Sequence, residues 1–322
     1  MKAIVHHKYG VPDGLELRDV EKPALADDGV MVRVRASSVN PAEWYAVTGM
    51  PYVARPAMGL RGPKHPIPGA DFAGTVEAVG GAVTEFRPGE AVFGGTSSGA
   101  FAEYVCVRKA VVPKPTNLTF EQAAAVPTAA VTALQGLRDK GRIRPGQKVL
   151  VNGASGGVGT FAVQLAKAFG AEVTGVCSTK AVDLVRSIGA DHVIDYTRED
   201  FTRGGQRYDL LLDVAGSRSW PEYRRVLDHK ATMILIGGPK ASRWIGPLGH
   251  VARVRMASLG ASQKVVFFVA SFNREDFVLL QELLEAGKVT PVIDRRYALS
   301  ELPQALRYLG EGHARGKVVI TV

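Results

Sequence analysis

The chain has 322 residues, of which 46% are hydrophobic and 22% are charged, and its formal net charge is +9. This length favours two domains, because one hydrophobic core rarely serves more than about 250–300 residues. The composition is that of a soluble globular enzyme, and the longest apolar runs, such as Val265–Ala270, are too short to cross a bilayer.

The basic charge does not indicate a nucleic-acid-binding protein. Lys and Arg are scattered along the chain, without a basic arm or a paired Cys/His finger, which favours a soluble surface with some phosphate-binding sites. The start "MKAIVHHKYG" lacks the charged and apolar regions of a secretory signal, and the two cysteines are Cys106 and Cys177. We therefore expect a cytoplasmic protein without a cysteine-rich zinc site.

Short β-like runs separated by Gly and Pro turns fill the first third of the chain. The runs are "MKAIVHH", "LELRDV", "GVMVRVRASSV", "AGTVEAVG", "AVFGG" and "AFAEYVCVR". Many short strands at this spacing predict a barrel-like β domain. The pattern changes near Phe120, where Thr119 followed by Glu121 and Gln122 is typical of a helix start.

From Lys148 onward, strand patterns alternate with helical patterns. The predicted strands are Lys148–Asn152, Glu172–Cys177, His192–Asp195, Tyr208–Val214, Thr232–Ile236 and Lys264–Ala270. This alternation predicts a parallel, doubly wound α/β sheet. After a predicted helix over Arg274–Ala286 the chain turns β-like again, with a short helix from Pro303 and a last strand in "GKVVITV", and this tail is expected to return to the first domain.

A glycine-rich loop, "GASGGVG", joins the first of these strands to the helix that follows. It reads Ala154-x-Gly156-x-x-Gly159, the dinucleotide-binding pattern with alanine at the first glycine position. Small residues let the backbone approach a pyrophosphate, which the N–H groups of the helix N-terminus then bind. The strand before the loop, and the amphipathic helix and second strand after it, make a dinucleotide site the predicted function.

Other readings of the loop stay open at this point. Gly153–Gly157 also reads G-x-S-x-G, which would make Ser155 a hydrolase nucleophile with Asp213 and then His229 or His313 downstream. The additional glycines favour phosphate binding, because an elbow has no use for them. Short-chain reductases carry a similar loop at the chain start with a Tyr-x-x-x-Lys pair, and this sequence has no such pair. A third alternative is a packing turn that binds no ligand, but four glycines would then lower stability through backbone entropy without a compensating function.

The end of the second strand indicates which dinucleotide binds. NAD sites place an acidic residue there for the ribose 2′-hydroxyl. This strand instead ends Cys177-Ser178-Thr179-Lys180, which supplies hydroxyl groups and a cation for a 2′-phosphate. The sequence therefore predicts NADPH in preference to NADH.

These motifs together resemble the medium-chain dehydrogenase/reductase superfamily, in particular its zinc-independent quinone oxidoreductase-like branch. The resemblance covers essentially the whole chain and rests on "SSVNPAEWYAVTG", "PIPGADFAGTVEAVG", "RPGEAVFG", "AAAVPTAAVTAL", "VLVNGASGGVGTFAVQLAKAFGAEVTGVCST", "GADHVIDY" and "GKVVITV". It implies a GroES-like β-barrel catalytic domain over 1–122 and 288–322, and a Rossmann NADP-binding domain over 123–287.

The departures from the zinc-dependent members imply chemistry without a metal. Asn40 stands where those enzymes carry a cysteine ligand, Gly69-Ala70-Asp71 stands for their Gly-His-Glu, and Thr128 lies near the third ligand position. The cysteine-rich lobe that holds structural zinc is missing as well. Zinc sites need three or four converging N, O or S ligands, so the resemblance implies no zinc.

The same resemblance implies a set of site residues. Those assigned to catalysis or the substrate mouth are Asn40, Tyr45, Tyr52 and Thr128. Those assigned to the cofactor are Thr132, Asn152, Ala154, Ser155, Gly156, Gly157, Val158, Gly159, Cys177, Ser178, Lys180, Tyr196, Val214, Ala215, Gly216, Ile236, Gly237, Gly238, Phe268, Val269, Arg315 and Lys317. Ser178, Lys180 and Tyr196 match positions that hold the 2′-phosphate, and Arg315 would add charge there.

The implied activity is hydride transfer from NADPH to a quinone or an α,β-unsaturated carbonyl, since these acceptors are electron-poor without a metal. Asn40 and backbone N–H groups would stabilise the developing anion, and water or a tyrosine would supply the proton. A non-catalytic NADPH-binding or structural member of the same fold is the alternative, and a serine hydrolase is a remote one.

The expected partners are a small-molecule quinone or enone and a second copy of the chain, with no nucleic acid. The homodimer would form through the apolar edge strand Lys264–Ala270. Gly237–Gln263 mixes apolar and arginine side chains. It is expected to be a connecting helix at the cleft or interface, and the alternative is a basic lid that contacts a membrane.

Overall fold

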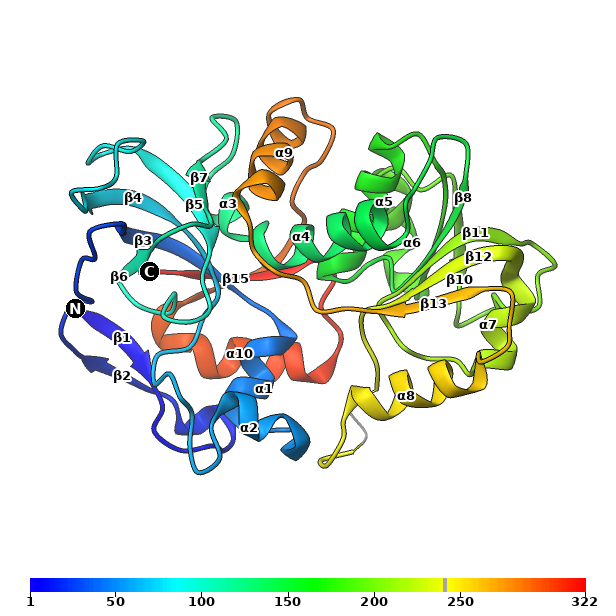
Figure 1. The fold of residues 1–322 in the computed structure, drawn as a ribbon, viewed down its shortest axis with the longest axis horizontal. Helices are drawn as coiled ribbons and strands as arrows, with labels where there is room; N and C mark the ends of the chain where they lie inside the picture. The colour runs from blue at the N-terminus through cyan, green and yellow to red at the C-terminus, as the bar shows by residue number, and fades with distance from the viewer. Residues whose placement is uncertain (240–241) are drawn as a thin grey trace. The chain divides into compact units, whose positions relative to one another are not determined.

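The computed structural model describes residues 1–239 and 242–322, which form two compact units (Figure 1). Unit 1 comprises Met1–Val131, Phe272–Gly287 and Pro291–Val322, and unit 2 comprises Thr132–Ser271 and Lys288–Thr290. The expected division at 122/123 and 287/288 differs from this one chiefly at Phe272–Gly287. That segment carries helix α9 (Arg274–Glu285), which packs against strand β7 (Val111–Pro113) of unit 1.

Unit 1 is built on a seven-stranded, mostly antiparallel sheet, as the short β-like runs predict. Its order is β14-β15-β3-β4-β5-β7, with β6 also paired to β3, and a separate hairpin joins β1 to β2. The bounds are β1 (Lys2–Val5), β2 (Glu16–Asp19), β3 (Val30–Val39), β4 (Asp71–Val79), β5 (Ala91–Gly95), β6 (Tyr104–Val107), β14 (Ile293–Ala298) and β15 (Lys317–Thr321). The C-terminal tail therefore completes the N-terminal sheet.

Three strand ends meet at one point of this sheet. β3 runs antiparallel to both β4 and β15, with Ser38 opposite Asp71 and Val39 opposite Val318. The end of β3 consequently lies beside the first residues of β4 and β15. Polar residues at these three ends are brought together although they are far apart in the sequence.

The remaining helices of unit 1 are short. They are η1 (Pro12–Gly14), α1 (Pro41–Thr48), η2 (Tyr52–Ala54), α2 (Arg55–Met58), α3 (Phe120–Ala124), η5 (Leu299–Glu301) and α10 (Leu302–Glu311). α3 begins where the sequence predicts, because the Thr119 hydroxyl accepts from the Gln122 N–H and the Gln122 side chain accepts from the Thr119 N–H. α1 and α10 pack on each other and share a core with β15 that includes Val47, Leu306 and Val318.

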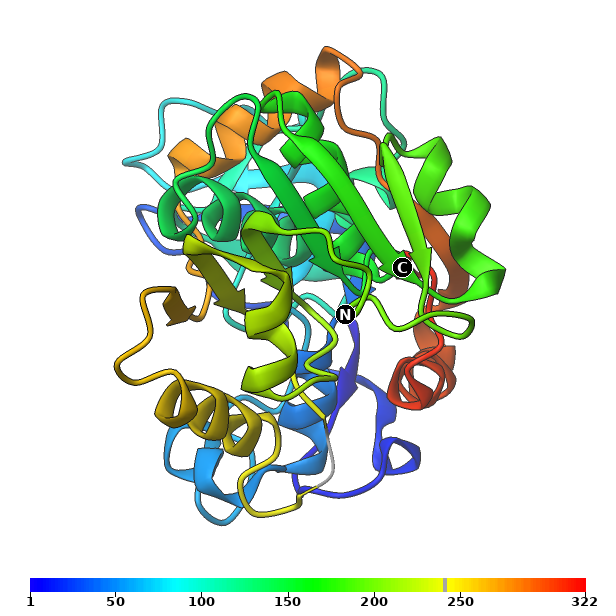
Figure 2. The same cartoon turned by 90° about the vertical axis from the view of Figure 1, so that its right-hand side faces the viewer.

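Unit 2 contains a six-stranded parallel sheet, which confirms the predicted doubly wound fold (Figure 2). The strand order β10-β9-β8-β11-β12-β13 corresponds to the order 3-2-1-4-5-6 of dinucleotide-binding sheets. The bounds are β8 (Lys148–Asn152), β9 (Glu172–Cys177), β10 (His192–Asp195), β11 (Tyr208–Asp213), β12 (Leu227–Leu235) and β13 (Lys264–Phe267). The first three agree with the predicted ranges. β12 begins earlier than predicted because Leu227 still pairs with Tyr208.

Helices cover both faces of this sheet. They are α4 (Pro127–Gln135), which begins in unit 1, η3 (Gly136–Lys140), α5 (Gly157–Ala168), η4 (Thr179–Ala181), α6 (Val182–Ser187), α7 (Trp220–Val226) and α8 (Pro247–Ala257). Alternation along β11 directs Leu211 into the core that includes Tyr223 of α7 and Val251 of α8. The buried Asp213 follows two residues later and points to the same face.

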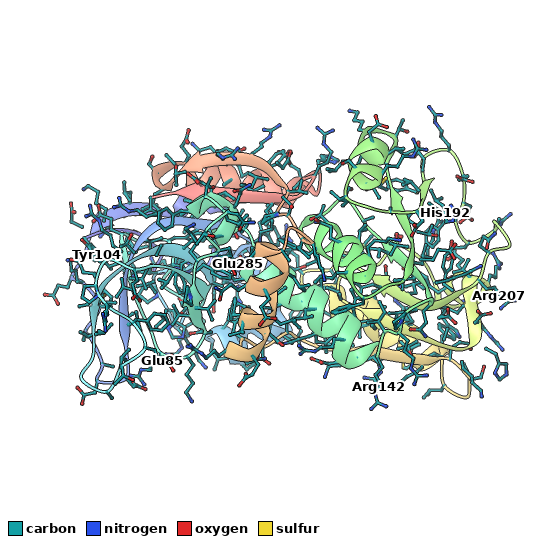
Figure 3. The ribbon with its side chains drawn as sticks, turned by 90° about the horizontal axis from the view of Figure 1, so that it is seen from above. Glu85, Tyr104, Arg142, His192, Arg207 and Glu285 are labelled. Carbon is teal, nitrogen blue, oxygen red and sulfur yellow. The ribbon has the colours of Figure 1, made fainter. Side chains whose placement is uncertain are left out.

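Charged side chains cover the exterior of each unit (Figure 3). Buried apolar side chains form separate cores, as the composition predicts for a globular chain. Among the described residues, no helix has both the length and the apolar character that crossing a bilayer requires.

Candidate functional site

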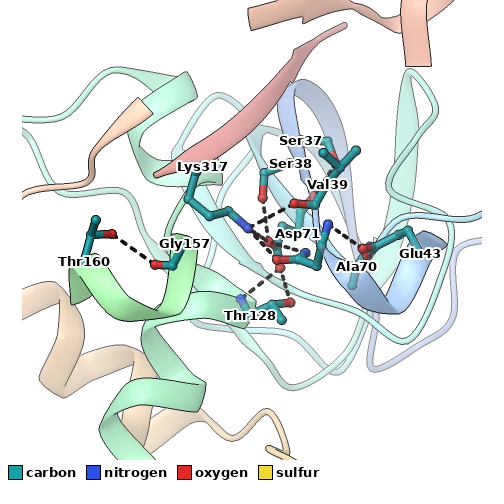
Figure 4. Close-up of polar contacts among 11 residues, drawn as sticks. Ser37, Ser38, Val39, Glu43, Ala70, Asp71, Thr128, Gly157, Thr160 and Lys317 are labelled. Carbon is teal, nitrogen blue, oxygen red and sulfur yellow. Dashed lines mark hydrogen bonds and ion pairs between the residues drawn. The ribbon is translucent and has the colours of Figure 1, made fainter. Parts of the chain in front are cut away.

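The meeting point of the three strand ends in unit 1 holds a buried carboxylate, Asp71, which is 0% exposed (Figure 4). One oxygen, Oδ1, accepts from the backbone N–H of Thr128 at 2.9 Å and from its hydroxyl at 2.5 Å. The other, Oδ2, accepts from the Ser38 hydroxyl at 2.6 Å and from the Asn40 amide at 2.9 Å. A buried carboxylate is tolerated only with such partners.

The counter-ion of Asp71 is Lys317, which is 3% exposed. Its ammonium lies 3.4 Å from Asp71 Oδ2 and also donates to Asn40 Oδ1 and to the Val39 carbonyl. All three of its N–H bonds thus have acceptors within unit 1. The resemblance assigns Lys317 to the cofactor, and in unit 1 its ammonium contacts the Val39 carbonyl, Asn40 and Asp71.

Asn40 is oriented by these two charges. Its carbonyl oxygen faces the ammonium and its amide N–H faces the carboxylate. The flipped amide would instead place its N–H against the ammonium and its oxygen against the carboxylate. The residue is 4% exposed. Sequence reasoning places Asn40 and Thr128 at the substrate. The structure places the polar atoms just described in contact with Asp71 or Lys317.

Glu43 stands beside this network as the third residue of α1. Its Oε2 accepts from the Asn40 N–H at 2.7 Å and its Oε1 accepts from the Ala70 N–H at 3.1 Å. The side chain is buried, and burial together with the nearby Asp71 raises the pKa of Glu43 to about 7, although Lys317 opposes the shift. A carboxyl group that holds its proton near neutral pH is suited to acid–base chemistry.

A cavity of about 320 Å³ in unit 1 has Glu43 among its lining residues. Its apolar wall includes Ala46, Met58 and Pro63, and its polar wall includes His6, Glu43 and His65. His6 is 4% exposed, and among the described residues its Nδ1 has no hydrogen-bond partner. The cavity therefore combines an apolar body with a few polar groups, as small-molecule sites do. Its lining includes none of the four residues expected at the substrate, which are Asn40, Tyr45, Tyr52 and Thr128.

In unit 2 the glycine loop has the backbone proximity that the motif predicts. A Cβ on Gly159 would lie 2.0 Å from the Gly153 carbonyl oxygen, so a side chain there would displace the loop. The loop is pinned to β9 by the N–H groups of Gly153 and Ala154, which donate to the Val176 carbonyl. α5 begins at Gly157 with Gly156 as its N-cap. The strand–loop–helix geometry fits a bound dinucleotide.

A second hydrogen-bonded cluster lies at the carboxyl ends of β8 and β11. The Asn152 amide donates to Asp213 Oδ1 at 2.8 Å, and the Gly216 N–H donates to the same oxygen at 3.0 Å. Asp213 Oδ2 accepts from the Tyr223 hydroxyl at 2.7 Å. These two strands flank the point where strand order reverses, at which parallel sheets bind their ligands. Asp213 thus holds the loop after β11 in place.

The loops after β11 and β12 cross with their backbones in contact. A Cβ on Gly237 would lie 1.9 Å from the Val214 carbonyl oxygen, and one on Gly216, at φ +63°, would lie 2.4 Å from Gly238 Cα. Glycine is thus required for steric reasons at this crossing. The expected cofactor residues Val214, Ala215, Gly216, Ile236, Gly237 and Gly238 are brought together here.

The residues expected at the 2′-phosphate lie at the ends of β9 and β10. Lys180 is exposed, Tyr196 is 54% exposed, and Ser178 is half-buried. Sequence reasoning finds no carboxylate at the end of β9, yet the structure brings one from the neighbouring strand. The Thr179 hydroxyl donates to Asp195 Oδ2, which helps hold the pKa of that carboxyl below its usual value.

The other expected residues are distributed between the units. Arg315 is exposed in unit 1, and its backbone N–H donates to Asp294. Thr132 and Phe268 are half-buried in unit 2, and Val269 is 82% exposed. In the segment predicted as a connecting helix or lid, α8 forms the helix, and residues 240–241 lie outside the described part of the chain.

If the loop were a hydrolase elbow, His229 could not serve as the catalytic histidine beside Asp213. Asp213 lies at the carboxyl end of β11, whereas His229 follows Leu227, which pairs with Tyr208 at the opposite end. Both oxygens of Asp213 are also engaged by other donors. The acid and this histidine are therefore separated by the length of the sheet.

The donor set of unit 1 does not fit a catalytic zinc ion. Ala70 has no ligating side-chain atom, the Asn40 oxygen accepts from the Lys317 ammonium, and the same ammonium neutralises Asp71. Zinc takes deprotonated N, S or O ligands, and a fixed ammonium among them opposes a second cation.

Sequence reasoning passes over Glu43 and assigns Asp71 no role beyond replacing a ligand. Asn40 followed three residues later by Glu43 is a helix-start pattern that could have located the carboxyl group. Asp71 and Lys317 each begin a strand and are followed directly by apolar residues, a context in which a charged side chain indicates a buried pair. Their pairing is a property of the tertiary structure.

Comparison with known proteins gives consistent matches along the chain. A family model described as "Alcohol dehydrogenase GroES-like domain" matches residues 26–116, and one described as "Zinc-binding dehydrogenase" matches 188–320. The chain is 35% identical to the mitochondrial NAD(P)H oxidoreductase RTN4IP1 of Mus musculus, covering 100% of this chain and 89% of that protein. It is 33% identical to the chloroplastic NADPH-dependent alkenal/one oxidoreductase of Arabidopsis thaliana, covering 99% and 79%.

A solved structure is similar over its whole length. The quinone oxidoreductase from Coxiella burnetii superimposes with a TM-score of 0.86 at 29% identity, covering 100% of this chain and 99% of that one. The likeness thus extends over both units.

Proposed function

Since the chain belongs to the medium-chain dehydrogenase/reductase superfamily, we propose that it is an NADPH-dependent reductase of quinones or α,β-unsaturated carbonyls that works without a metal. The observation that carries the proposal is the crossing of glycine backbones at the carboxyl ends of β11 and β12, next to the glycine loop. When bound there, NADPH supplies a hydride from its nicotinamide ring. The relatives named above, an alkenal/one oxidoreductase and a quinone oxidoreductase, support the choice of acceptors.

The chain's own residues supply binding, orientation and charge. In unit 2, the N-terminus of α5 and the loop from Gly153 to Gly159 would bind the pyrophosphate. In unit 1, the cavity bounded by Glu43 would receive the acceptor. Asn40 does not line this cavity, but the Lys317 ammonium polarises its amide through the oxygen, which would favour negative charge on an acceptor atom brought close to that amide.

Steady-state oxidation of NADPH with ortho-quinones, para-quinones and alkenals tests this function. Turnover of at least one class supports it, and activity should survive treatment with a chelator because no zinc takes part. Tight NADPH binding without turnover of any acceptor would instead favour the non-catalytic alternative. A Ser155→Ala variant that keeps reductase activity would dispose of the hydrolase alternative.

The NADPH preference is assigned to Lys180 at the end of β9. Lys180→Ala is expected to weaken NADPH binding about 5- to 150-fold, the equivalent of ~1–3 kcal/mol for a charged hydrogen bond, and to leave NADH nearly unchanged. Titration of both cofactors by fluorescence measures the two affinities. Lys230→Ala, at an exposed position of β12, is the matched control. Equal losses for both cofactors would contradict the assignment.

We also propose a homodimer formed through β13. This strand is the edge of the unit 2 sheet, its Val265 and Phe267 are half-buried, and Val269 just beyond it is 82% exposed. An unpaired apolar edge is a ready template for pairing with a second copy. Light scattering after size-exclusion chromatography should give twice the chain mass, and Val266→Pro should yield the monomer.

A further inference from the structure

We propose that Glu43 is the proton donor of the reaction, delivering its carboxyl proton to the α-carbon of an α,β-unsaturated carbonyl acceptor held in the unit 1 cavity. The inference rests on the proposed function and adds to it a residue and a substrate class. Neither of the tyrosines expected near the substrate lines this cavity. Glu43 does, and its carboxyl group is the acidic one among the lining residues.

The surroundings of Glu43 favour the protonated acid. Glu43 is 4% exposed, and the carboxylate of Asp71 is close enough to raise its pKa by charge repulsion. Asp71 is paired with Lys317 and accepts hydrogen bonds from four donor groups. A second buried negative charge beside it is costly, so Glu43 retains its proton to a higher pH than an ordinary carboxyl group.

The cavity has the chemistry of an enone site. Ala46, Met58 and Pro63 offer an apolar surface to a carbon chain, and the buried Nδ1 of His6 lacks a partner among the described residues. A ligand oxygen or polar hydrogen near His6 would satisfy that nitrogen. Lys64 and His65 are exposed at the rim, which gives water access for reprotonation.

Bound NADPH would supply the hydride that adds to the β-carbon, and the C=C electron pair would move to the carbonyl oxygen to give an enolate. The O–H bond of Glu43 then breaks as a C–H bond forms at the α-carbon, which leaves the saturated ketone and a Glu43 carboxylate. Water at the cavity rim returns the proton. A quinol anion, in contrast, is protonated readily by water and depends less on the donor.

The test compares an alkenal or enone with a quinone in wild type and Glu43→Gln. Glutamine keeps the size of the side chain and an acceptor oxygen but holds no transferable proton. We expect kcat for the enone to fall about 100-fold, the usual contribution of a general acid, with a much smaller loss for the quinone. Glu222→Gln is the matched control. Glu222 is likewise the third residue of its helix, and its side chain accepts from the N–H of the N-cap residue.

The pH profile of wild type provides a readout that does not depend on the variant's folding. Enone kcat/KM should decrease as pH rises through about 7, the pKa of Glu43, and Glu43→Gln should lose this limb. The other charged groups near the carboxyl are Asp71, Lys317, His6, Lys64 and His65. Burial lowers the pKa of His6 below 6.5, so its titration would appear on the acidic side instead.

The outcomes separate the two proposals. If wild type reduces enones but neither Glu43→Gln nor the pH profile shows the expected loss, the proton-donor role is wrong and the reductase function stands. If wild type binds NADPH and reduces neither acceptor, the proposed function itself is wrong and this inference falls with it. An equal loss for enone and quinone would mark Glu43 as structural and overturn the inference.

Discussion

At the scale of single residues, the buried ion pair of unit 1 fixes the position of the polar side chains around it. Asp71 and Lys317 are both almost fully buried and 3.4 Å apart, and Asn40 bridges them through opposite ends of its amide. Removing one partner of such a pair leaves an uncompensated charge, which costs much more than the net contribution of the intact pair.

Lys317→Met is therefore expected to lower the free energy of unfolding by about 3–5 kcal/mol. The double variant Lys317→Met/Asp71→Asn, which removes both charges, should recover part of that loss. Urea denaturation of wild type, Lys317→Met, Asp71→Asn and the double variant gives the comparison. A double variant as unstable as the sum of its single variants would show that the pair is not coupled.

The pH dependence of stability reports the protonation of Glu43. Its folded pKa of about 7 lies above the ordinary 4.5, so its contribution is complete below pH 4.5 and is lost as pH rises to about 7. The buried His6 acts in the opposite direction, since its lowered pKa favours the folded state as pH rises toward 6.5. Glu43→Gln should lose less free energy of unfolding than wild type between pH 5 and pH 8. Parallel curves would contradict the raised pKa.

At the scale of elements, the glycine loop depends on how closely β8 and α5 approach each other. A Cβ at Gly159 would meet the Gly153 oxygen at 2.0 Å, whereas one at Gly156 would meet the same oxygen at 3.6 Å, an ordinary contact. Two glycines of one motif thus differ in what they do. Gly159 is needed for the backbones to pack, whereas the proposed function would use Gly156 for the approach of a phosphate.

Gly159→Ala should prevent the loop from closing, with a large drop in Tm and no measurable NADPH binding. Gly156→Ala should fold with a Tm within a few degrees of wild type, because its Cβ has room. Thermal denaturation followed by circular dichroism measures both. A stable Gly159→Ala protein would show that the loop adapts by moving its backbone.

At the scale of the whole molecule, two units of different architecture divide the chemistry. The antiparallel sheet of unit 1 brings strand ends together around Asp71, and the parallel sheet of unit 2 brings loops together at its carboxyl edge. Phe272–Gly287 returns to unit 1 although it follows the last strand of unit 2. The sequence does not show that this segment belongs to unit 1, because the pattern of an amphipathic helix is the same in either unit.

The sequence by itself determined the local structure and the class of cofactor. Strand and helix periodicity located the unit 2 strands β8, β9 and β10, and small residues after β8 indicated a dinucleotide, because these signals depend on neighbours along the chain. Tertiary structure alone decided the contacts between distant residues. It buried Lys317 against Asp71 and brought Asp195 beside Thr179. It also placed Glu43 between a buried charge pair and a cavity, where desolvation and a neighbouring charge, which act through space, set its protonation.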